Sequence, residues 1–508
     1  MRLPSILGFA AVTFAAPAWA QSSDPPAPTT GQAPAPPTPA PDAQASAAPE
    51  RPPLPPSAPT EANAPAAPVS GDTAAPPEQP TTGFSFGSYG RVGIASDLRG
   101  RLGRQANIAA FASRLDLAPY MEVQFNYDWR MRGTRWRAVT TIAANDTLFH
   151  FTGRFDGTFA IRNLYLEERG VLHDALSLWV GSRMYRGDDV YLLNWWPLDN
   201  LNMVGAGARF EPGDNLVVQA AVGMNRLDDP YQLQTFQTTP REGFGAVNAL
   251  LLDRPRIITV AKATWFFSGR DARAGMKASL YGEFHTMAEG VRQTSERGDR
   301  ILMPSDQGYV VGAQWGIYSG RNFLNVFVRW AEGLGAYGEL RVPAVRDSIR
   351  TSERAQEFRV ALSANWEAGP FALMGGAYAR YFRDADPGVF GRNAMWEGAV
   401  VARPIVWFGQ YAGIAGELSF EHVTYNALDP ETGDGAVRGS LFRAGIVPFV
   451  SPGGRGSYTR PHLQLVYLAT VRDAGARRLY APGDPFGFND VEHYLGVTTE
   501  WWFNSSYL

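Results

Sequence analysis

The chain has 508 residues, a formal net charge of −3 and no cysteine. The lack of cysteine excludes disulfides, thiol catalysis and cysteine-ligated metals, and the small net charge argues against nucleic acid, whose backbone requires a strongly basic surface. Beyond the extreme N-terminus, no apolar run reaches the roughly 18 residues of a membrane-spanning helix. The length fits several domains or one large β architecture.

The first element is a predicted secretory signal peptide at residues 1–20. Arg2 supplies the positive start, residues 6–16 are apolar, and Ala18-Trp19-Ala20 forms a small-x-small cleavage site before Gln21. A short buried helix is the alternative interpretation. The signal peptide indicates export from the cytoplasm.

Residues 21–82 form the next segment, which is rich in proline, alanine, serine and threonine. Such a composition has few apolar side chains to bury, so it predicts a disordered tether that is partly polyproline II. A cell-wall or periplasmic partner of this tether is a hypothesis. The folded domain is expected at residues 83–508.

Alternating strands dominate that domain. Residues 120–130 read YMEVQFNYDWR, in which Met121, Val123 and Phe125 share one parity with two further aromatic residues, and polar residues take the other. Period-two alternation predicts a strand, because successive side chains leave opposite faces of the pleat. Similar alternation recurs at residues 175–185, 215–224, 275–284, 308–318, 322–330, 357–366, 369–381, 396–407, 415–423, 460–468 and 492–503.

Many such strands behind a signal peptide are typical of an outer-membrane β-barrel. In hydrocarbon every backbone N–H and C=O must be paired, and a closed barrel pairs them all in sheet form. The length accommodates roughly 16 to 18 strands at about 9–11 residues each. We therefore predict an all-β, transmembrane antiparallel barrel in the outer membrane of a Gram-negative bacterium, in contact with its lipid and wide enough for an aqueous channel.

The C-terminal segment EHYLGVTTEWWF, residues 492–503, fits a closing strand. One parity is expected to face lipid: Leu495, Val497, Thr499, Trp501 and Phe503. The other is expected to face the lumen: Tyr494, Gly496, Thr498, Glu500 and Trp502. A final strand ending in an aromatic residue is similar to the insertion signal of outer-membrane proteins, although residues 504–508 extend past it here.

Four stretches resemble the maltoporin family of sugar-specific outer-membrane porins. The first is FSFGSYGRVGIAS at residues 84–96, and the second is RLDLAPYME at residues 114–122. The third combines IRNLYLE at 161–167, LWVGSRMYRGDD at 178–189 and residues 190–207, which end in VGAG. The fourth is GVTTEWWF at residues 496–503. The resemblance spreads over the barrel and is most specific in its first third and last strand. It implies 18 strands, a homotrimer and oligosaccharide solutes, with no cofactor and no metal.

In that family an aromatic line forms a slide for sugar rings, with a polar track and an inward third loop opposite it. Sugar C–H faces stack on aromatic rings, and their hydroxyls exchange water for polar side chains, while binding stays weak enough for release. The resemblance implies slide residues at Tyr89, Tyr120, Trp502 and either Trp407 or Phe408. It implies a polar track and constriction at Arg91, Arg114, Glu122, Arg162, Arg186, Asp189, Asn194 and Trp196.

The chain departs from the family pattern in its third loop. Gly187 stands where the family has an arginine, with Arg186 beside it, Asn194 replaces an aspartate, and Trp196 replaces a tyrosine. These changes predict an altered bore or sugar preference. The second-loop tryptophan that reaches a neighbouring subunit has no match within residues 149–162, which puts family-like trimer contacts in question.

A hydrolase is one alternative to the channel. GFSFG at residues 83–87 matches G-x-S-x-G, but a nucleophile elbow requires a strand before Ser85 and a helix after it, and here a proline-rich segment precedes an alternating strand. None of the six histidines lies in a recognisable catalytic pattern. An enzyme is therefore not predicted. A general diffusion porin, a porin for charged solutes and an outer-membrane anchor remain alternatives.

Overall fold

The computed structural model describes residues 82–145, 158–225, 233–238, 247–252, 254–293, 300–341, 351–385, 394–425, 437–481 and 483–504. All of them belong to one compact unit, Ala58–Leu508. The predicted signal peptide lies outside the described residues. So do residues 21–81 of the predicted tether and most of the second-loop region compared above.

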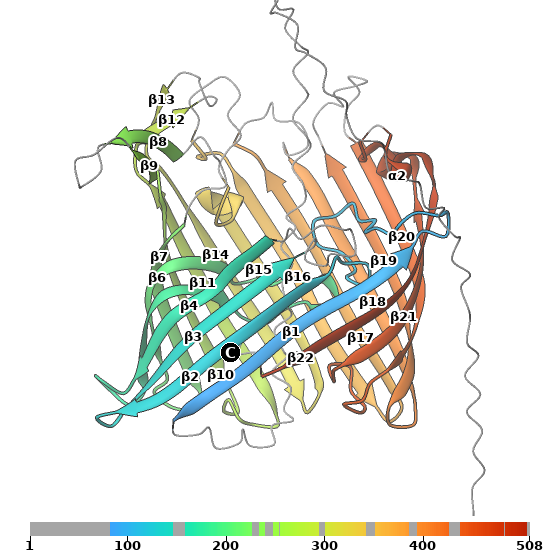
Figure 1. Ribbon diagram of the computed structural model, residues 1–508, viewed down its shortest axis with the longest axis horizontal. Coiled ribbons are helices and arrows are strands. Elements are labelled where there is room, and N and C mark those ends of the chain that lie inside the picture. Colours follow the sequence, from blue (N-terminus) through green and yellow to red (C-terminus); the bar gives the residue numbers. More distant parts are fainter. Residues whose placement is uncertain are drawn as a thin grey trace, which may run out of the picture. The chain divides into compact units, whose positions relative to one another are not determined.

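Eighteen antiparallel strands form one sheet that closes on itself (Figure 1), which confirms the predicted barrel. Its first half contains β1 (Gly83–Ser96), β2 (Tyr120–Met131), β3 (Thr134–Asn145), β4 (Thr158–Arg169), β5 (Leu176–Arg186), β6 (Asn200–Phe210), β7 (Leu216–Asn225), β10 (Arg256–Phe266) and β11 (Ala274–Met287). Its second half contains β14 (Asp306–Ser319), β15 (Asn322–Gly333), β16 (Gln356–Ala368), β17 (Phe371–Arg383), β18 (Met395–Phe408), β19 (Ala412–Tyr425), β20 (Val437–Val450), β21 (His462–Arg472) and β22 (Val491–Phe503).

The period-two pattern appears as alternating burial along each strand. In β2, Glu122 and Gln124 are buried, while Val123 and Phe125 on the opposite face are partly exposed. In β22, Val497 and Phe503 are exposed on the outer face, as expected. Apolar side chains therefore cover the outside of the sheet and polar side chains line its inside, which is the arrangement that a lipid solvent requires.

Pairing between β1 and β22 closes the barrel. Tyr89 lies opposite Trp502 and Gly90 opposite Trp501, so the two aromatic side chains of β22 flank the seam from the inner and outer faces. A Cβ at position 90 would overlap the Trp501 ring. Glycine is needed there because a neighbouring strand's side chain lies directly over its backbone.

The two ends of the barrel differ. Short turns join β2 to β3, β14 to β15 and β16 to β17 at one end, which also holds the longer connection between β20 and β21, whereas the other long connections lie at the opposite end. In outer-membrane barrels the short turns face the periplasm. Figure 1 shows α2 and the small hairpins at the end with the long connections.

The connections contain a few short elements. These are η2 (Tyr191–Leu193), η4 (Leu334–Tyr337), α1 (Ala474–Arg478), α2 (Pro485–Phe488), and the pairs β8 (Leu233–Thr238) with β9 (Val247–Leu252) and β12 (Gly290–Gln293) with β13 (Arg300–Met303). In the described part of the chain, no helix has the length and apolar character needed to cross a membrane. The candidate site is formed by three other connections, which turn into the barrel.

Candidate functional site

The connection between β5 and β6, residues 187–199, is called loop L3 here and lies inside the barrel. Every residue from Asp189 to Asp199 is buried. Asn194 turns the loop back with a φ of 51°, in the left-handed region that asparagine tolerates better than most residues. A Cβ at Gly376 would lie 2.9 Å from Val190 Cγ1, so L3 packs directly on β17, across the barrel from β5.

Two ion pairs hold the ends of L3 to the wall. Lys277 on β11 lies 2.7 Å from Asp188 Oδ2, and Lys262 on β10 lies 2.7 Å from Asp199 Oδ2. Although burial alone would raise the pKa of Asp188, the Lys277 ammonium beside it holds that pKa below its ordinary value. Burial raises the pKa of neighbouring Asp189 well above its ordinary value. Adjacent carboxyl groups of L3 therefore differ in their affinity for protons.

The predicted constriction residues of L3 pack within the loop and on its flanking strands. The Arg186 guanidinium carbon lies 4.3 Å from the Trp196 ring centroid, and Arg186 Nε donates to Asn200 at 2.7 Å. Asp189 Oδ2, Asn194 Oδ1 and Trp196 Nε1 are buried without a hydrogen-bond partner within the described residues. Those polar atoms are candidates for contact with a solute.

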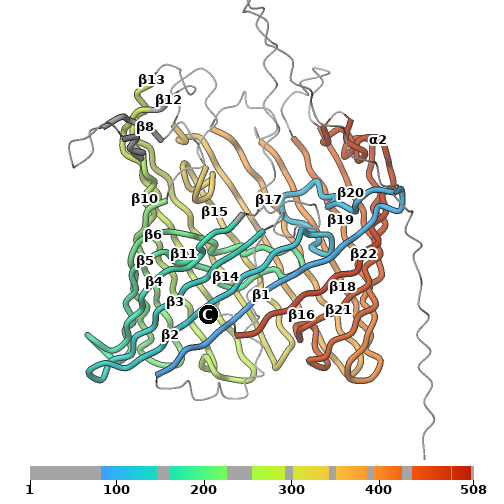
Figure 2. Tube along the Cα trace, in the orientation of Figure 1, coloured from blue at the N-terminus to red at the C-terminus, as the bar shows by residue number. Residues whose placement is uncertain are grey.

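A second connection, between β1 and β2, also lies inside. It comprises residues 97–119, is called loop L1 here, and follows β1 as a blue trace in Figure 2. Its successive backbone N–H groups at residues 108–111 donate to the side chains of Glu421, Glu397 and Tyr378 at 2.8–3.1 Å. Three wall strands thereby satisfy backbone groups that a buried loop would otherwise leave unpaired.

Loops L1 and L3 stack on each other through aromatic rings. Phe111 of L1 and Trp195 of L3 are parallel, with ring centroids 4.3 Å apart. Tyr378 on β17 contacts both rings, and its centroid is 5.3 Å from that of Trp195. The two loops therefore form a single packed layer across the lumen.

The third inward connection is residues 451–461, between β20 and β21, called the β20–β21 segment here. It joins L1 and L3 at the carboxylate of Glu500 on β22. Arg114 Nη2 of L1 donates at 2.6 Å, Tyr191 Oη of L3 at 2.6 Å and Arg460 Nε of the segment at 2.9 Å. Tyr89 Oη donates to the same carboxylate at 3.1 Å. Glu500 thus holds three connections together.

The predicted slide residues of β1 and β2 lie beside this carboxylate. Tyr89 and Tyr120 have ring centroids 6.0 Å apart, and the Arg91 guanidinium carbon lies 5.3 Å from the Tyr120 centroid. Arg162 pairs with Glu122 at 2.7 Å, and both bond the Tyr120 hydroxyl. The structure brings all five residues to one part of the inner wall, where Tyr89 is only 1% exposed.

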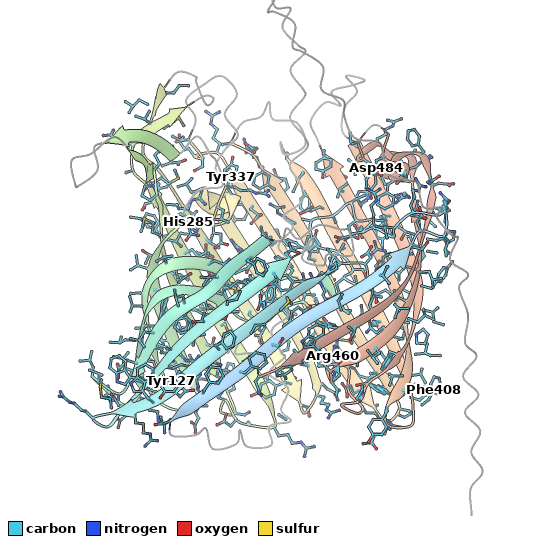
Figure 3. The ribbon with its side chains drawn as sticks, in the orientation of Figure 1. Tyr127, His285, Tyr337, Phe408, Arg460 and Asp484 are labelled. Atoms are coloured by element: carbon cyan, nitrogen blue, oxygen red, sulfur yellow. The ribbon has the colours of Figure 1, made fainter. Side chains whose placement is uncertain are left out.

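The remaining slide candidates, Trp407, Phe408 and Trp502, do not all lie on the inner face of the barrel. Trp407 points inward and is 5% exposed, whereas Phe408 points outward and is 58% exposed. Figure 3 shows Phe408 at the edge of the barrel and Arg460 within its outline. Trp502 points inward, but Arg460 lies over its ring, with the guanidinium carbon 4.1 Å from the centroid. Phe408 is the candidate that the structure does not bring to the lumen.

Several residues of the site were not among the sequence predictions: Phe111, Tyr191, Trp195, Arg460 and Glu500. For Glu500, the sequence signal was its parity, which predicted a position on the inner face of the closing strand. The inward course of L1 and of the β20–β21 segment has no periodic signature. No cluster of three or more metal-ligating side chains occurs within the described ranges. Ser85 is the third residue of β1, and its hydroxyl accepts from Asn126 Nδ2 at 3.3 Å.

A closed 18-stranded barrel with an apolar outer surface, a charged inner wall and an infolded third loop defines an outer-membrane diffusion channel. Residues 84–503 match the family description LamB porin, and the chain belongs to that family.

Solved structures give a more distant comparison. The chain is similar to OpdL of Pseudomonas aeruginosa (10% identity, TM-score 0.42) and OpdQ of the same organism (8% identity, TM-score 0.40), with 83% of this chain and 98% of each relative covered. OccD3 (OpdP) of Pseudomonas aeruginosa aligns at 9% identity and a TM-score of 0.39, over 83% of this chain and 91% of that one. No curated protein sequence matches the chain.

Proposed function

We propose that this porin carries oligosaccharides by facilitated diffusion, along an aromatic surface with charged partners. The supporting observation is the set Tyr89, Tyr120 and Trp502, which lies on adjoining strands β1, β2 and β22. Arg114 with Glu500 and Arg162 with Glu122 border these rings. Rings that stack on sugar C–H faces and ion pairs that exchange hydrogen bonds with hydroxyls are the chemistry a sugar requires.

Burial determines how a solute reaches these rings. Tyr89 is 1% exposed and Tyr120 4%, because Arg91, Arg114 and the Glu500 contacts cover them. A sugar reaches this surface when L1 or the β20–β21 segment moves, exchanging its hydrogen bonds for those of the solute. Such an exchange has a small net free energy, which suits a channel that must release what it binds.

The first test is planar-bilayer conductance of the purified protein with titrated maltooligosaccharides. We expect saturable block by sugar, and we expect Trp502→Ala to weaken that block by about twofold to tenfold, since a stacked ring contributes about 0.5–1.5 kcal/mol. Trp366→Ala is the matched control, because Trp366 is 53% exposed on the outer face of β16.

A general diffusion porin is the competing function. Conductance that no sugar blocks would favour it, and would reject the aromatic slide. Equal loss of block in both tryptophan variants would instead show an effect on the barrel and not on a sugar surface. The homotrimer, and a partner for residues 21–82, remain proposals that rest on the resemblance and on the composition of the chain.

A further inference from the structure

Three arginines lie side by side on the inner wall, at one level of three neighbouring strands. Arg329 of β15 is opposite Arg359 of β16, which is opposite Arg380 of β17. Like charges directly opposite one another in a sheet are destabilising. The row therefore has a physical cost that a structural role alone does not explain.

Nearby carboxylates neutralise this row only in part. Glu357 lies 2.6 Å from both Arg359 and Arg380, and Glu397 lies 2.9 Å from Arg380. Arg329 makes no ion pair or hydrogen bond within the described residues, although it is 6% exposed. The two carboxylates at bonding distance thus engage Arg359 and Arg380 but not Arg329.

The other acidic neighbour of Arg329 is Glu283 on β11, whose interaction with Arg329 is electrostatic only. Its two oxygens bond the Tyr281 hydroxyl at 2.5 Å and His285 Nε2 at 2.6 Å. Glu283 is therefore already engaged by its own strand, and Arg329 keeps donors available.

Buried donors without acceptors mark where a ligand would bind. The Nε atoms of Arg329 and Arg359 are both buried and have no hydrogen-bond partner within the described ranges. An unsatisfied buried donor is costly, most of all on a charged group. A carboxylate or sulfate group offers several acceptor oxygens to such a guanidinium fork and would satisfy these donors.

The row also lies where the inner loops meet the wall. The Arg359 guanidinium carbon is 5.6 Å from the Trp195 ring centroid of L3 and 5.9 Å from the Phe111 centroid of L1. A solute that crosses the layer formed by these loops therefore passes aromatic rings and unsatisfied cations together. Neutral sugars have no group that needs three guanidinium groups.

We propose that Arg329, Arg359 and Arg380 form an oxyanion subsite, and that the preferred solutes are acidic saccharides carrying a carboxylate or sulfate group. This inference rests on the proposed sugar channel and adds the substrate class. The arginine fork binds the acid group, while the rings of the two loops contact the sugar.

The test compares block by oligogalacturonate with block by a neutral maltooligosaccharide of the same length, in one bilayer assay. For the wild type we expect acidic block to be tighter by about tenfold or more, as hydrogen bonds to charged groups indicate. Arg329→Gln is expected to remove most of that preference and to leave neutral block unchanged. Arg329→Lys is expected to recover only part, because an ammonium lacks the bidentate fork.

Arg137→Gln is the control with the same loss of charge, because Arg137 pairs with Asp128 near the short-turn end, away from L3. Equal block by both sugars in the wild type would overturn the subsite and leave the sugar channel intact. Block by neither sugar would overturn the sugar channel itself. Inorganic sulfate that blocks as tightly as oligogalacturonate would overturn the saccharide preference, since the row would then be a site for simple anions.

Discussion

At the residue scale, Arg460 covers one face of the Trp502 ring. Its guanidinium lies over the ring and also pairs with Glu500, so one side chain covers a stacking face and joins the β20–β21 segment to β22. A sugar and a guanidinium compete for the same aromatic face. The segment thus covers Trp502, one of the proposed slide residues.

We expect Arg460→Ala to uncover Trp502 and strengthen sugar block by up to about tenfold, the value of one stacked ring. Glu500 keeps Arg114 and Tyr191 as partners, so the carboxylate is not left unpaired. Bilayer conductance with titrated sugar measures the change. Arg460→Lys, which keeps the charge and the Glu500 pair, serves as the control. Weaker block in Arg460→Ala would mean that Arg460 binds the sugar itself.

At the element scale, L3 packs against the inner wall because β17 has a glycine, Gly376, at the point of contact. Val190 Cγ1 would lie 2.9 Å and Leu192 Cβ 3.3 Å from a Cβ at position 376, so a larger residue there meets the loop directly. We expect Gly376→Val to push L3 away from the wall and change single-channel conductance by more than about twofold, with a cost to stability of about 1–3 kcal/mol for overpacking.

Gly375→Val is the matched control for this change, on the same strand and the opposite face. Its Cβ would have Ala364 Cβ at 3.8 Å as its nearest neighbour, which is ordinary contact. We expect Gly375→Val to conduct like the wild type. Equal conductance in both variants would show that L3 yields without altering the bore.

Elements were predictable where the alternation is strong, and less so elsewhere. The strand at residues 120–130 and the closing strand at 492–503 read correctly, because apolar and polar residues alternate along their whole length. β6, NLNMVGAGARF, and β20, VRGSLFRAGIVPFV, contain small residues or breaks in the alternation, and their pattern alone did not mark them. A strand between two paired neighbours needs no strong pattern of its own, since tertiary context decides it.

The candidate site also contains residues that a local sequence pattern predicts and residues that it does not. Tyr89, Glu122 and Trp502 were placed on the inner face by parity, because strand geometry fixes which side each residue occupies. The course of L1, by contrast, depends on hydrogen bonds from residues 108–111 to wall residues about three hundred positions away, such as Glu421. No local pattern carries that information. The arginine row likewise needs the register of three strands.

At the scale of the whole molecule, the barrel depends on a seam between its first and last strands. An unclosed sheet would leave β1 and β22 as edges with unpaired backbone groups, which is costly in lipid and prone to aggregation. On the outer face of this seam the Trp501 ring lies over Gly90 and its Nε1 donates to Ser88 Oγ at 3.1 Å. Closure therefore requires a position without a side chain opposite a tryptophan.

We expect Gly90→Val to impair closure, because its side chain would overlap the Trp501 ring, and to reduce the fraction that migrates as the compact, heat-modifiable species on unheated gels. Gly282→Val is the control, because Gly282 is also on the outer face and a Cβ there would have Val310 O at 3.7 Å as its nearest neighbour. Adding Trp501→Ala to Gly90→Val should restore the compact species by removing the overlapping ring. A compact fraction in Gly90→Val equal to the control would mean that Trp501 shifts freely and that the seam tolerates a side chain.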